Sequence, residues 1–311
     1  MGDQSIEVII PVRDMADHLP RLLQPLLDQI VDGDRVTVVN DASTDETEAV
    51  ARSLGAHVVT VTESRGPYFA RQLAASNSTA DVLLFVDGRC RPLPGLLDAH
   101  RQLQRQPGVA LSCTNVRTLP GPTVAARLAA RMQPFMLPRG GGAMKATIGM
   151  VPPQPDYYPT ANLGIDRIAF AKVGGFRAMR GGGDTDICWR IQNQSLGTIA
   201  ADTRVLMEWE PRATVGDLIS QWKRYGHSNA YMRWVHRNAT ADHVEDAGRR
   251  YSPAEAWQTL RTELRRPPGE LAATALVGIA FQYGYFSATL RRSKFEMPVS
   301  FDVVPDVGST T

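Results

Sequence analysis

Cysteine and lysine are both scarce in this chain of 311 residues. The three cysteines (Cys90, Cys113 and Cys188) are odd in number and lack metal-ligand spacing, so we expect neither a disulfide framework nor a zinc site. Lysine supplies only four of the 34 basic residues, and with 32 acidic residues the net charge is +2, which is too balanced for a general nucleic-acid binder. The remaining basic residues are arginines, an excess that reflects either coding composition or guanidinium groups that contact phosphate.

Several motifs of common enzyme classes are also absent. No Gly-x-Gly-x-x-Gly follows the first predicted strand, which disfavours a nicotinamide dehydrogenase, and no P-loop or Gly-x-Ser-x-Gly motif occurs, which disfavours a P-loop nucleotidase and an α/β-hydrolase. No His-x-x-x-His pair is present, so we do not expect a histidine metal site. The N-terminus lacks a basic region followed by an apolar stretch, so we expect no signal peptide and a cytoplasmic protein.

Apolar, β-branched segments alternate with helical patterns through the first 115 residues. Strands are predicted at 6–12, 35–40, 57–61, 81–86 and 109–114, and helices at 19–30, from 46 to about 54, at 66–78 and at 94–106. This alternation predicts an α/β fold, in which a mostly parallel sheet carries helices on both faces. Ligands of such sheets bind at the carboxyl ends of the strands.

The later part of the chain has a different character. Eight prolines and a triple glycine between Leu119 and Pro159 predict a long irregular loop, which is the expected place for acceptor recognition. Regular structure is expected again from Asn162, and the pattern is mainly helical after Pro211. Residues 271–290 carry no formal charge but have modest hydropathy, so we expect a buried or membrane-surface helix rather than a spanning one.

Charged side chains follow the predicted strands. Asp41 either caps the next helix or accepts a hydrogen bond from a nucleobase N–H or a ribose hydroxyl. Asp87 ends an apolar strand and is followed by Arg89, and guanidinium groups beside a carboxylate suit a phosphorylated ligand. Asp184 and Asp186 follow three glycines; one of them can act as a general base while the other caps the helix.

These segments together resemble the family-2 inverting glycosyltransferases of the GT-A fold, a Rossmann-like architecture. The segments that carry the resemblance are Val-Ile-Ile-Pro-Val-Arg-Asp at 8–14, Val-Val-Asn-Asp-Ala-Ser-Thr-Asp at 38–45, Arg-Gly-Pro at 65–67 with Ala-Arg-Gln at 70–72, Leu-Phe-Val-Asp-Gly-Arg-Cys-Arg-Pro at 84–92, and Gly-Gly-Phe at 174–176 followed by Gly-Asp-Thr-Asp-Ile-Cys-Trp-Arg at 183–190. Glu-Pro-Arg at 210–212 and Arg-Tyr-Gly at 224–226 are similar to an actinobacterial branch that includes mycofactocin-type glycosyltransferases.

The resemblance implies a nucleotide-diphosphate sugar as donor, with a UDP-sugar expected, and an acceptor that is a small molecule, a peptide or lipid-linked. The residues that it implies for the nucleotide sugar are Pro11, Arg13, Asp41, Arg71, Asp87 and Arg89. Asp184 would deprotonate the acceptor, with Asp186 as the second catalytic candidate.

Four more residues are candidates for contacts to the diphosphate or the acceptor. Trp189 lies on the helix that follows the two aspartates, and residues 221–225 are similar to the Gln-x-x-Arg-Trp motif of processive members. In that motif Gln221 and Arg224 keep the family residues, and Tyr225 replaces the Trp. The alternative for this segment is an ordinary amphipathic helix.

Three departures from the family pattern concern the metal. Arg89 replaces the second Asp of the Asp-x-Asp motif, Gly183 replaces the Glu of the Glu-Asp pair, and Trp209 stands where many members have a metal-binding His. We therefore expect no cofactor, or weakly bound Mg²⁺ or Mn²⁺ with Asp87 as the remaining ligand, because a cation beside Arg89 would be repelled. Either Arg89 replaces the metal at the diphosphate, which we favour, or the site has lost transfer activity and only binds.

The expected organisation is a GT-A nucleotide-sugar-binding and catalytic domain over residues 1–210 and a helical C-terminal extension over residues 211–311. Residues 271–290 would place the protein at the inner face of the membrane if they contact it. The rival functions are a catalytically silent nucleotide-sugar-binding protein and a nucleotidylyltransferase. The second rival usually has a Gly-rich basic loop after the first strand, which the sequence lacks.

Overall fold

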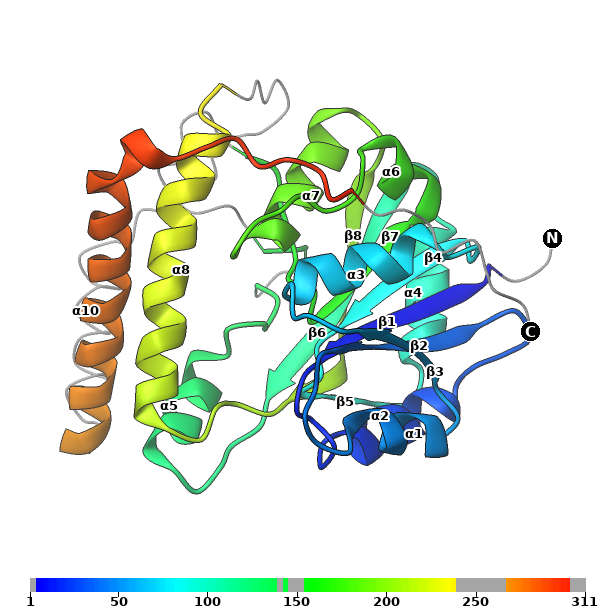
Figure 1. The fold of residues 1–311 in the computed structure, drawn as a ribbon, viewed down its shortest axis with the longest axis horizontal. Coiled ribbons are helices and arrows are strands. Elements are labelled where there is room, and N and C mark those ends of the chain that lie inside the picture. Colours follow the sequence, from blue (N-terminus) through cyan, green and yellow to red (C-terminus); the bar gives the residue numbers. More distant parts are fainter. Residues whose placement is uncertain (1–3, 139–141, 145–153, 239–266, 303–311) are drawn as a thin grey trace.

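A mixed sheet forms the centre of the protein (Figure 1). The computed structural model describes residues 4–138, 142–144, 154–238 and 267–302. The described residues form an eight-stranded sheet in the order β3-β2-β1-β4-β7-β6-β8-β5. The strands are β1 (Ile6–Val12), β2 (Arg35–Asp41), β3 (His57–Val61), β4 (Val82–Val86), β5 (Cys90–Pro92), β6 (Val109–Thr118), β7 (Asn162–Asp166) and β8 (Thr198–Trp209).

Helices cover both faces of this sheet, as the alternating pattern predicts. The helices are α1 (Leu19–Leu27), α2 (Thr47–Ser53), α3 (Pro67–Ser76), α4 (Leu96–Gln104), α5 (Val124–Met132), α6 (Arg167–Lys172), α7 (Gly183–Asn193), α8 (Val215–Val235) and α10 (Pro268–Leu290), with a short 3₁₀ turn at Arg292–Lys294. Helices α1, α2 and α4 lie on one face and α3 on the other (Figure 1). The leucines of α1 are buried against the strands, which explains the helical spacing seen in the sequence.

The first half of the sheet is parallel and the second half is mixed. Strands β1 to β4 pair in parallel, so their carboxyl ends share one edge. Strand β7 runs antiparallel to both of its neighbours, β4 and β6. The chain leaves β6 at the carboxyl edge and re-enters the sheet from that edge, so β7 has to run backwards. The predicted α/β fold is confirmed, and the sheet is more mixed than the sequence indicated.

Helix α5 and strand β8 are among the elements that were not predicted. Helix α5 lies inside the segment expected to be one irregular loop, where Thr123 caps it by accepting a hydrogen bond from the Ala126 N–H. Pro122 precedes this helix and Pro134 follows it, so the prolines bound a helix there rather than preventing one. Strand β8 escaped prediction because its first half is partly exposed and Asp202, Thr203 and Arg204 interrupt it, so it lacks the continuous apolar run of a central strand.

Helices α8 and α10 pack side by side and run parallel, away from the sheet (Figure 1). Their backbones approach closely at two glycines. A Cβ on Gly226 would lie 2.0 Å from the Phe281 carbonyl oxygen, and one on Gly284 would lie 2.0 Å from the Lys223 carbonyl oxygen. The expectation of a helical extension therefore agrees with the described part of 211–311, and residues 239–266 lie outside the described residues.

Helix α10 has a second property that bears on the extension. Among the described residues it is the one helix long and apolar enough, by length and composition, to cross a membrane. Its first turns close a small separate core with α5 and α8, built from Ala125, Leu128, Leu218, Ala273 and Val277. Strand β8 ends at Trp209 and α8 begins at Val215, and the domain boundary at residue 210 stays a prediction.

Candidate active site

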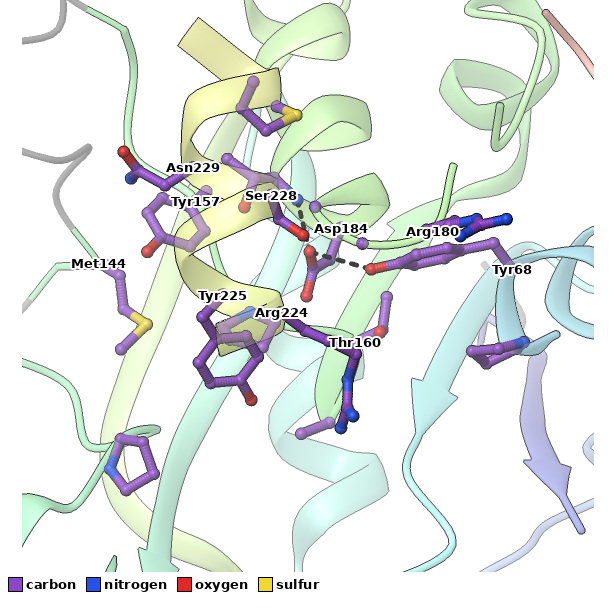
Figure 2. Close-up of a pocket in the computed structure, with 18 of the residues that line it drawn as sticks. Tyr68, Met144, Tyr157, Thr160, Arg180, Asp184, Arg224, Tyr225, Ser228 and Asn229 are labelled. Carbon is purple, nitrogen blue, oxygen red and sulfur yellow. Dashed lines mark hydrogen bonds between the residues drawn. The ribbon is translucent and has the colours of Figure 1, made fainter. Parts of the chain in front are cut away.

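A pocket of about 540 Å³ lies beside the carboxyl edge of the sheet, between that edge and helix α8 (Figure 2). Six of the predicted site residues line it: Arg71, Asp87, Asp184, Trp189, Arg224 and Tyr225. Residues from the expected acceptor loop also line it, among them Phe135, Met144 and Tyr157. Asp87 and Asp184 are its lining carboxylates and Arg71, Arg180 and Arg224 its lining guanidinium groups, so a positive charge remains in the described lining.

Asp184 lies in the pocket wall at the first turn of α7 (Figure 2). Its Oδ1 accepts hydrogen bonds from the Thr185 backbone N–H at 2.9 Å and from the Tyr68 hydroxyl at 3.4 Å. Burial raises the pKa of Asp184 above its ordinary value, although the Thr185 N–H and Arg71 oppose the shift. A carboxylate with a raised pKa and no strong ion pair is a suitable proton acceptor.

The triple glycine before Asp184 is explained by close packing. Gly182 has a φ of 84°, and a Cβ there would lie 2.9 Å from the Met232 side chain of α8. A Cβ on Gly183 would lie 2.9 Å from the ring of Tyr68. Gly183 takes the place of the family Glu, so the ring of Tyr68 occupies the space that a glutamate side chain would need.

Arg71 carries a buried cation into the same pocket. Its side chain comes from α3 and is only 4% exposed, yet its Nε has no hydrogen-bond partner among the described residues. Burial lowers the pKa of the Arg71 guanidinium, and Tyr68, Asp87 and Asp184 oppose the shift. A buried guanidinium nitrogen without a partner costs stability, and a phosphate oxygen would satisfy it.

Asp186, the second catalytic candidate from the sequence, lies outside the pocket lining. The side chain of Asp186 is fully buried. Its oxygens accept hydrogen bonds from Arg177, from Arg190 Nε at 2.8 Å and from His236 Nε2 at 2.9 Å. Despite burial, these partners hold the pKa of Asp186 far below its ordinary value. The i, i+2 spacing turns Asp186 away from Asp184, into an ion-pair cluster that joins α7 to the end of α8.

Asp41 is buried and is neither a helix cap nor a pocket residue. Its carboxylate accepts hydrogen bonds from the Ser64 hydroxyl at 2.8 Å and from the backbone N–H groups of Arg65 and Gly66 at 3.0 and 3.2 Å. It therefore holds the loop that leads into α3, the helix that carries Arg71. Neither of the sequence alternatives included this contact, because it joins residues 23 to 25 positions apart.

Pro11 and Arg13 also lie outside the lining of the pocket. Pro11 lies within β1 and Arg13 follows its end. The next residue, Asp14, adopts a positive φ of 51°, and its carboxylate accepts from the Thr44 N–H at 2.7 Å. The Arg13 side chain is about half exposed and approaches Asp14 at 3.8 Å. Hydrogen bonds between this turn and the turn after β2 hold the two turns together beside the edge of the sheet.

Arg89 is not among the pocket residues either, although it is two positions from Asp87. Its backbone N–H donates to Asp87 Oδ1 at 2.9 Å. The pKa of His18, at the N-terminus of α1, is lowered mainly by burial and next by the charge of Arg89. The buried cation on which both pocket carboxylates act is Arg71, whereas the sequence analysis favoured Arg89.

The donor groups present do not fit a tightly held divalent cation. Across 4–138, 142–144, 154–238 and 267–302, no three His, Cys, Asp or Glu side chains gather as metal ligands would. Asp87 is the remaining carboxylate of the Asp-x-Asp position. Trp209, at the position of the family His, is buried and packs edge-on against Phe135 at a centroid distance of 5.0 Å.

An aromatic wall closes the pocket on the side of α8 and α10. Gln221 does not line it, but its Nε2 donates to the Tyr225 hydroxyl at 2.7 Å and so positions that ring. Trp222 packs edge-on against Tyr225 and Phe281. The lining residues that were missing from the predicted site include Tyr68, Tyr157, Arg180, Trp222, Ser228, Asn229, Met232 and Phe281. Trp222 and Phe281 belong to the aromatic residues of the last hundred positions, a signal that alone does not indicate a pocket.

The fold is that of the GT-A class of glycosyltransferases. The sequence model of glycosyl transferase family 2 matches residues 7–180, more than half of the chain. The chain therefore belongs to glycosyl transferase family 2.

Individual relatives are similar over shorter stretches. The 4,4'-diaponeurosporenoate glycosyltransferase of Staphylococcus haemolyticus is 39% identical over 90 residues, and that of Staphylococcus aureus is 37% identical over 89 residues. Each match covers 27% of this chain and 24% of the relative, so the chain aligns with about a quarter of these proteins. Both are staphylococcal, and the similarity to an actinobacterial branch stays a prediction.

Among solved structures, a mannosyltransferase from Pyrobaculum calidifontis in complex with GDP-Man and Mn²⁺ matches with a TM-score of 0.58. The identity is 16%, and the match covers 94% of this chain and 89% of that chain. A likeness at this identity concerns the fold alone.

Proposed function

We propose that this protein transfers a sugar from a nucleotide-diphosphate donor to an acceptor, with inversion at the anomeric carbon and with Asp184 as general base. The observation that carries the proposal is the buried Asp184 carboxylate in the pocket wall, with its pKa raised and the Arg71 guanidinium nearby. A base and a cation in one pocket match the two charges that such a transfer develops.

The reaction is a single displacement. The acceptor oxygen bonds to the anomeric carbon while the bond from that carbon to the diphosphate oxygen breaks, and the diphosphate leaves with the electron pair. The acceptor proton passes to Asp184, on the face opposite the leaving group. Because burial disfavours the charged form of Asp184, taking up this proton relieves the cost of that charge.

The donor diphosphate is assigned to Arg71 first. A guanidinium group can bind two phosphate oxygens in one plane, and Arg71 lines the pocket with its Nε unpartnered among the described residues. Arg89 stays a second candidate for the outer part of the diphosphate. With one carboxylate at the metal position, we propose a transferase that is independent of Mg²⁺ and Mn²⁺ or only weakly dependent on them.

The acceptor is proposed to have an apolar body beside its nucleophilic group. Tyr157, Trp189, Trp222, Tyr225 and Phe281 line the pocket near Asp184, and aromatic faces bind apolar or ring-shaped groups. A small molecule, a peptide with an aromatic side chain and a lipid-linked acceptor all fit this description. The screening panel should include 4,4'-diaponeurosporenoate, which names the staphylococcal relatives.

Donor hydrolysis and transfer, measured for the wild type and Asp184→Asn, test the base. We expect Asp184→Asn to lower the turnover at least about a hundredfold while nucleotide binding persists. Asp98→Asn, an exposed aspartate on α4, is the matched control and should keep wild-type rates. Equal rates for the wild type and Asp184→Asn would favour a silent nucleotide-sugar-binding protein.

Titration calorimetry with UDP-sugars and GDP-sugars tests the donor site. Arg71→Ala should weaken nucleotide-sugar binding by about ten- to a hundredfold, the usual size of a charge-assisted hydrogen bond, and Arg89→Ala should weaken it less. The reverse order would assign the diphosphate to Arg89. A hundredfold gain in affinity on adding Mg²⁺ or Mn²⁺ would contradict metal independence.

A further inference from the structure

The outward face of α10 is built from large apolar side chains. Leu276, Ile279, Tyr283, Phe286 and Leu290 lie on the exposed side, with Ile279 65% and Leu290 85% exposed. The side that packs on the protein is built from the small or short residues Ala273, Val277, Ala280, Gly284 and Ala288. A surface helix in water has the opposite arrangement, with its large apolar residues inside and polar ones outside.

This arrangement is typical of a helix whose outer face meets lipid. Small residues let two helix backbones approach closely, as Gly226 and Gly284 do between α8 and α10. The apolar face forms a continuous stripe, because Leu276, Ile279 and Tyr283 are spaced three and four residues apart. Residues 271–290 add no charge to interrupt it.

Cations frame the stripe at its C-terminal end. Arg291, Arg292 and Lys294 are exposed, and none forms an ion pair with a carboxylate in the described part of the chain. Lys223 of α8 lies 4.8 Å from the centre of the Tyr283 ring, at the side of the stripe. The acidic group near this end is Glu296, so cations dominate the border. Basic side chains next to an apolar stripe complement the phosphates of an anionic membrane.

The packing of α10 on α8 decides how α10 can lie relative to a membrane. Along its length α10 contacts α8, which carries Asp217, Lys223, Arg224 and Arg233. A spanning α10 would draw this charged partner into the hydrocarbon layer, at a cost of several kcal/mol for each charge. A helix that lies in the plane of the membrane buries its outer stripe and leaves α8 and the sheet in water.

We propose that the outer face of α10 docks the protein on the surface of an anionic phospholipid bilayer. The occupant is lipid rather than a second copy of the chain, because a copy would bring its own cations to the same border. Phe281, on the opposite side of α10, lines the pocket, so docking sets the aromatic wall next to the bilayer. The proposal is independent of the sugar-transfer chemistry.

Sedimentation of the full-length protein with large unilamellar vesicles tests this surface. The vesicles contain phosphatidylcholine alone or an equal mixture with phosphatidylglycerol. We expect binding to the mixed vesicles, weakened at least about tenfold by Ile279→Asp. Ile168→Asp is the matched control, because Ile168 on α6 is 56% exposed and far from α10 in the fold. Equal thermal midpoints would show that both variants are folded.

A charge variant separates the electrostatic part. Replacing Arg291, Arg292 and Lys294 together by Gln should lower binding to the mixed vesicles by about a hundredfold, at about one kcal/mol per cation. Binding to phosphatidylcholine alone should not change. The proposal is overturned if the wild type ignores mixed vesicles or if Ile279→Asp and Ile168→Asp behave alike. It is equally overturned if the protein forms a dimer without lipid that Ile279→Asp dissociates. Donor hydrolysis by the same variants reports separately on the proposed reaction.

Discussion

Asp184 and Asp186 stand two positions apart, and we expect the loss of their charges to have opposite effects on stability. Asp186 is fully buried and bonds to Arg177, Arg190 and His236. Asp186→Asn keeps the size of the side chain but leaves two guanidinium groups without their anion. Breaking a buried ion pair from one side costs about 3–5 kcal/mol. For a domain of this size that loss lowers the thermal midpoint on the order of 10 °C.

The same substitution at Asp184 should not lower the midpoint. Burial raises the pKa of Asp184, so its charge opposes folding at neutral pH, and a neutral Asn removes that cost. Differential scanning calorimetry of both variants, together with turnover, gives the comparison. Asp202→Asn is the matched control, because its ion pair with Arg204 is partly exposed and should cost at most about 1 kcal/mol. A wild-type midpoint for Asp186→Asn would refute the buried ion-pair reasoning.

Acid adds a second readout for Asp186. Its pKa is lowered on folding, so its contribution to stability is present above the unfolded-state pKa of about 3.9 and is lost as the pH falls below it. The difference in midpoint between the wild type and Asp186→Asn should therefore be largest at neutral pH and shrink below about pH 4. A difference that stays constant down to pH 3 would mean that packing rather than charge is lost.

Two further predictions concern helix packing and acid stability. Gly226→Ala should destabilise the protein by about 1–3 kcal/mol, because the new Cβ would lie 2.0 Å from a carbonyl oxygen of α10. The control is Gly278→Ala, whose Cβ meets nothing within 4 Å and which should stabilise the protein by about 1 kcal/mol. Equal effects of the two substitutions in urea melts would contradict the close packing. Burial lowers the pKa of His100 to about 4, so between pH 7 and 5 the unfolded chain gains a proton at this residue that the native state does not. This proton destabilises the wild type as the pH falls. His100→Gln lacks the titrating group, so its loss of stability between pH 7 and 5 should be about 2 kcal/mol smaller than that of the wild type.

Strands β1, β2 and β4 of the parallel half could be predicted from sequence because they are buried on both faces. Such strands are continuous apolar runs, and the predicted segment 6–12 coincides with β1. The predicted segment 57–61 coincides with β3, an edge strand that is partly exposed. Strand β8 was missed for the complementary reason, since it is partly exposed and its polar residues break any run. Helix α5 was missed because the many prolines between Leu119 and Pro159 indicate a loop for the segment as a whole. The position of each proline, rather than their number, decides where a helix ends.

The site was predictable where a motif fixes the backbone and not where tertiary contacts choose the partners. Asp184, Asp87 and Arg71 come to one pocket from three separate motifs, because the carboxyl ends of the strands bring those segments together. Asp186 shares a motif with Asp184, but its partners Arg177 and His236 come from elsewhere in the chain. No spacing rule in the sequence indicates which of two neighbouring carboxylates meets those cations.

Some residues of the pocket lie within the part of the chain that the family model matches, and others lie beyond it. Arg71 and Asp87 lie within the matched residues 7–180, whereas Trp222, Tyr225 and Phe281 lie on helices beyond them. Part of the charged lining thus lies within the matched residues, and α8 and α10 add these three aromatic side chains from outside them. Because these two helices are locked together at Gly226 and Gly284, a substitution in either one acts on the same wall. Changes to Trp222, Tyr225 or Phe281 should therefore alter acceptor choice while donor affinity stays the same, a separation that KM values for the two substrates would measure.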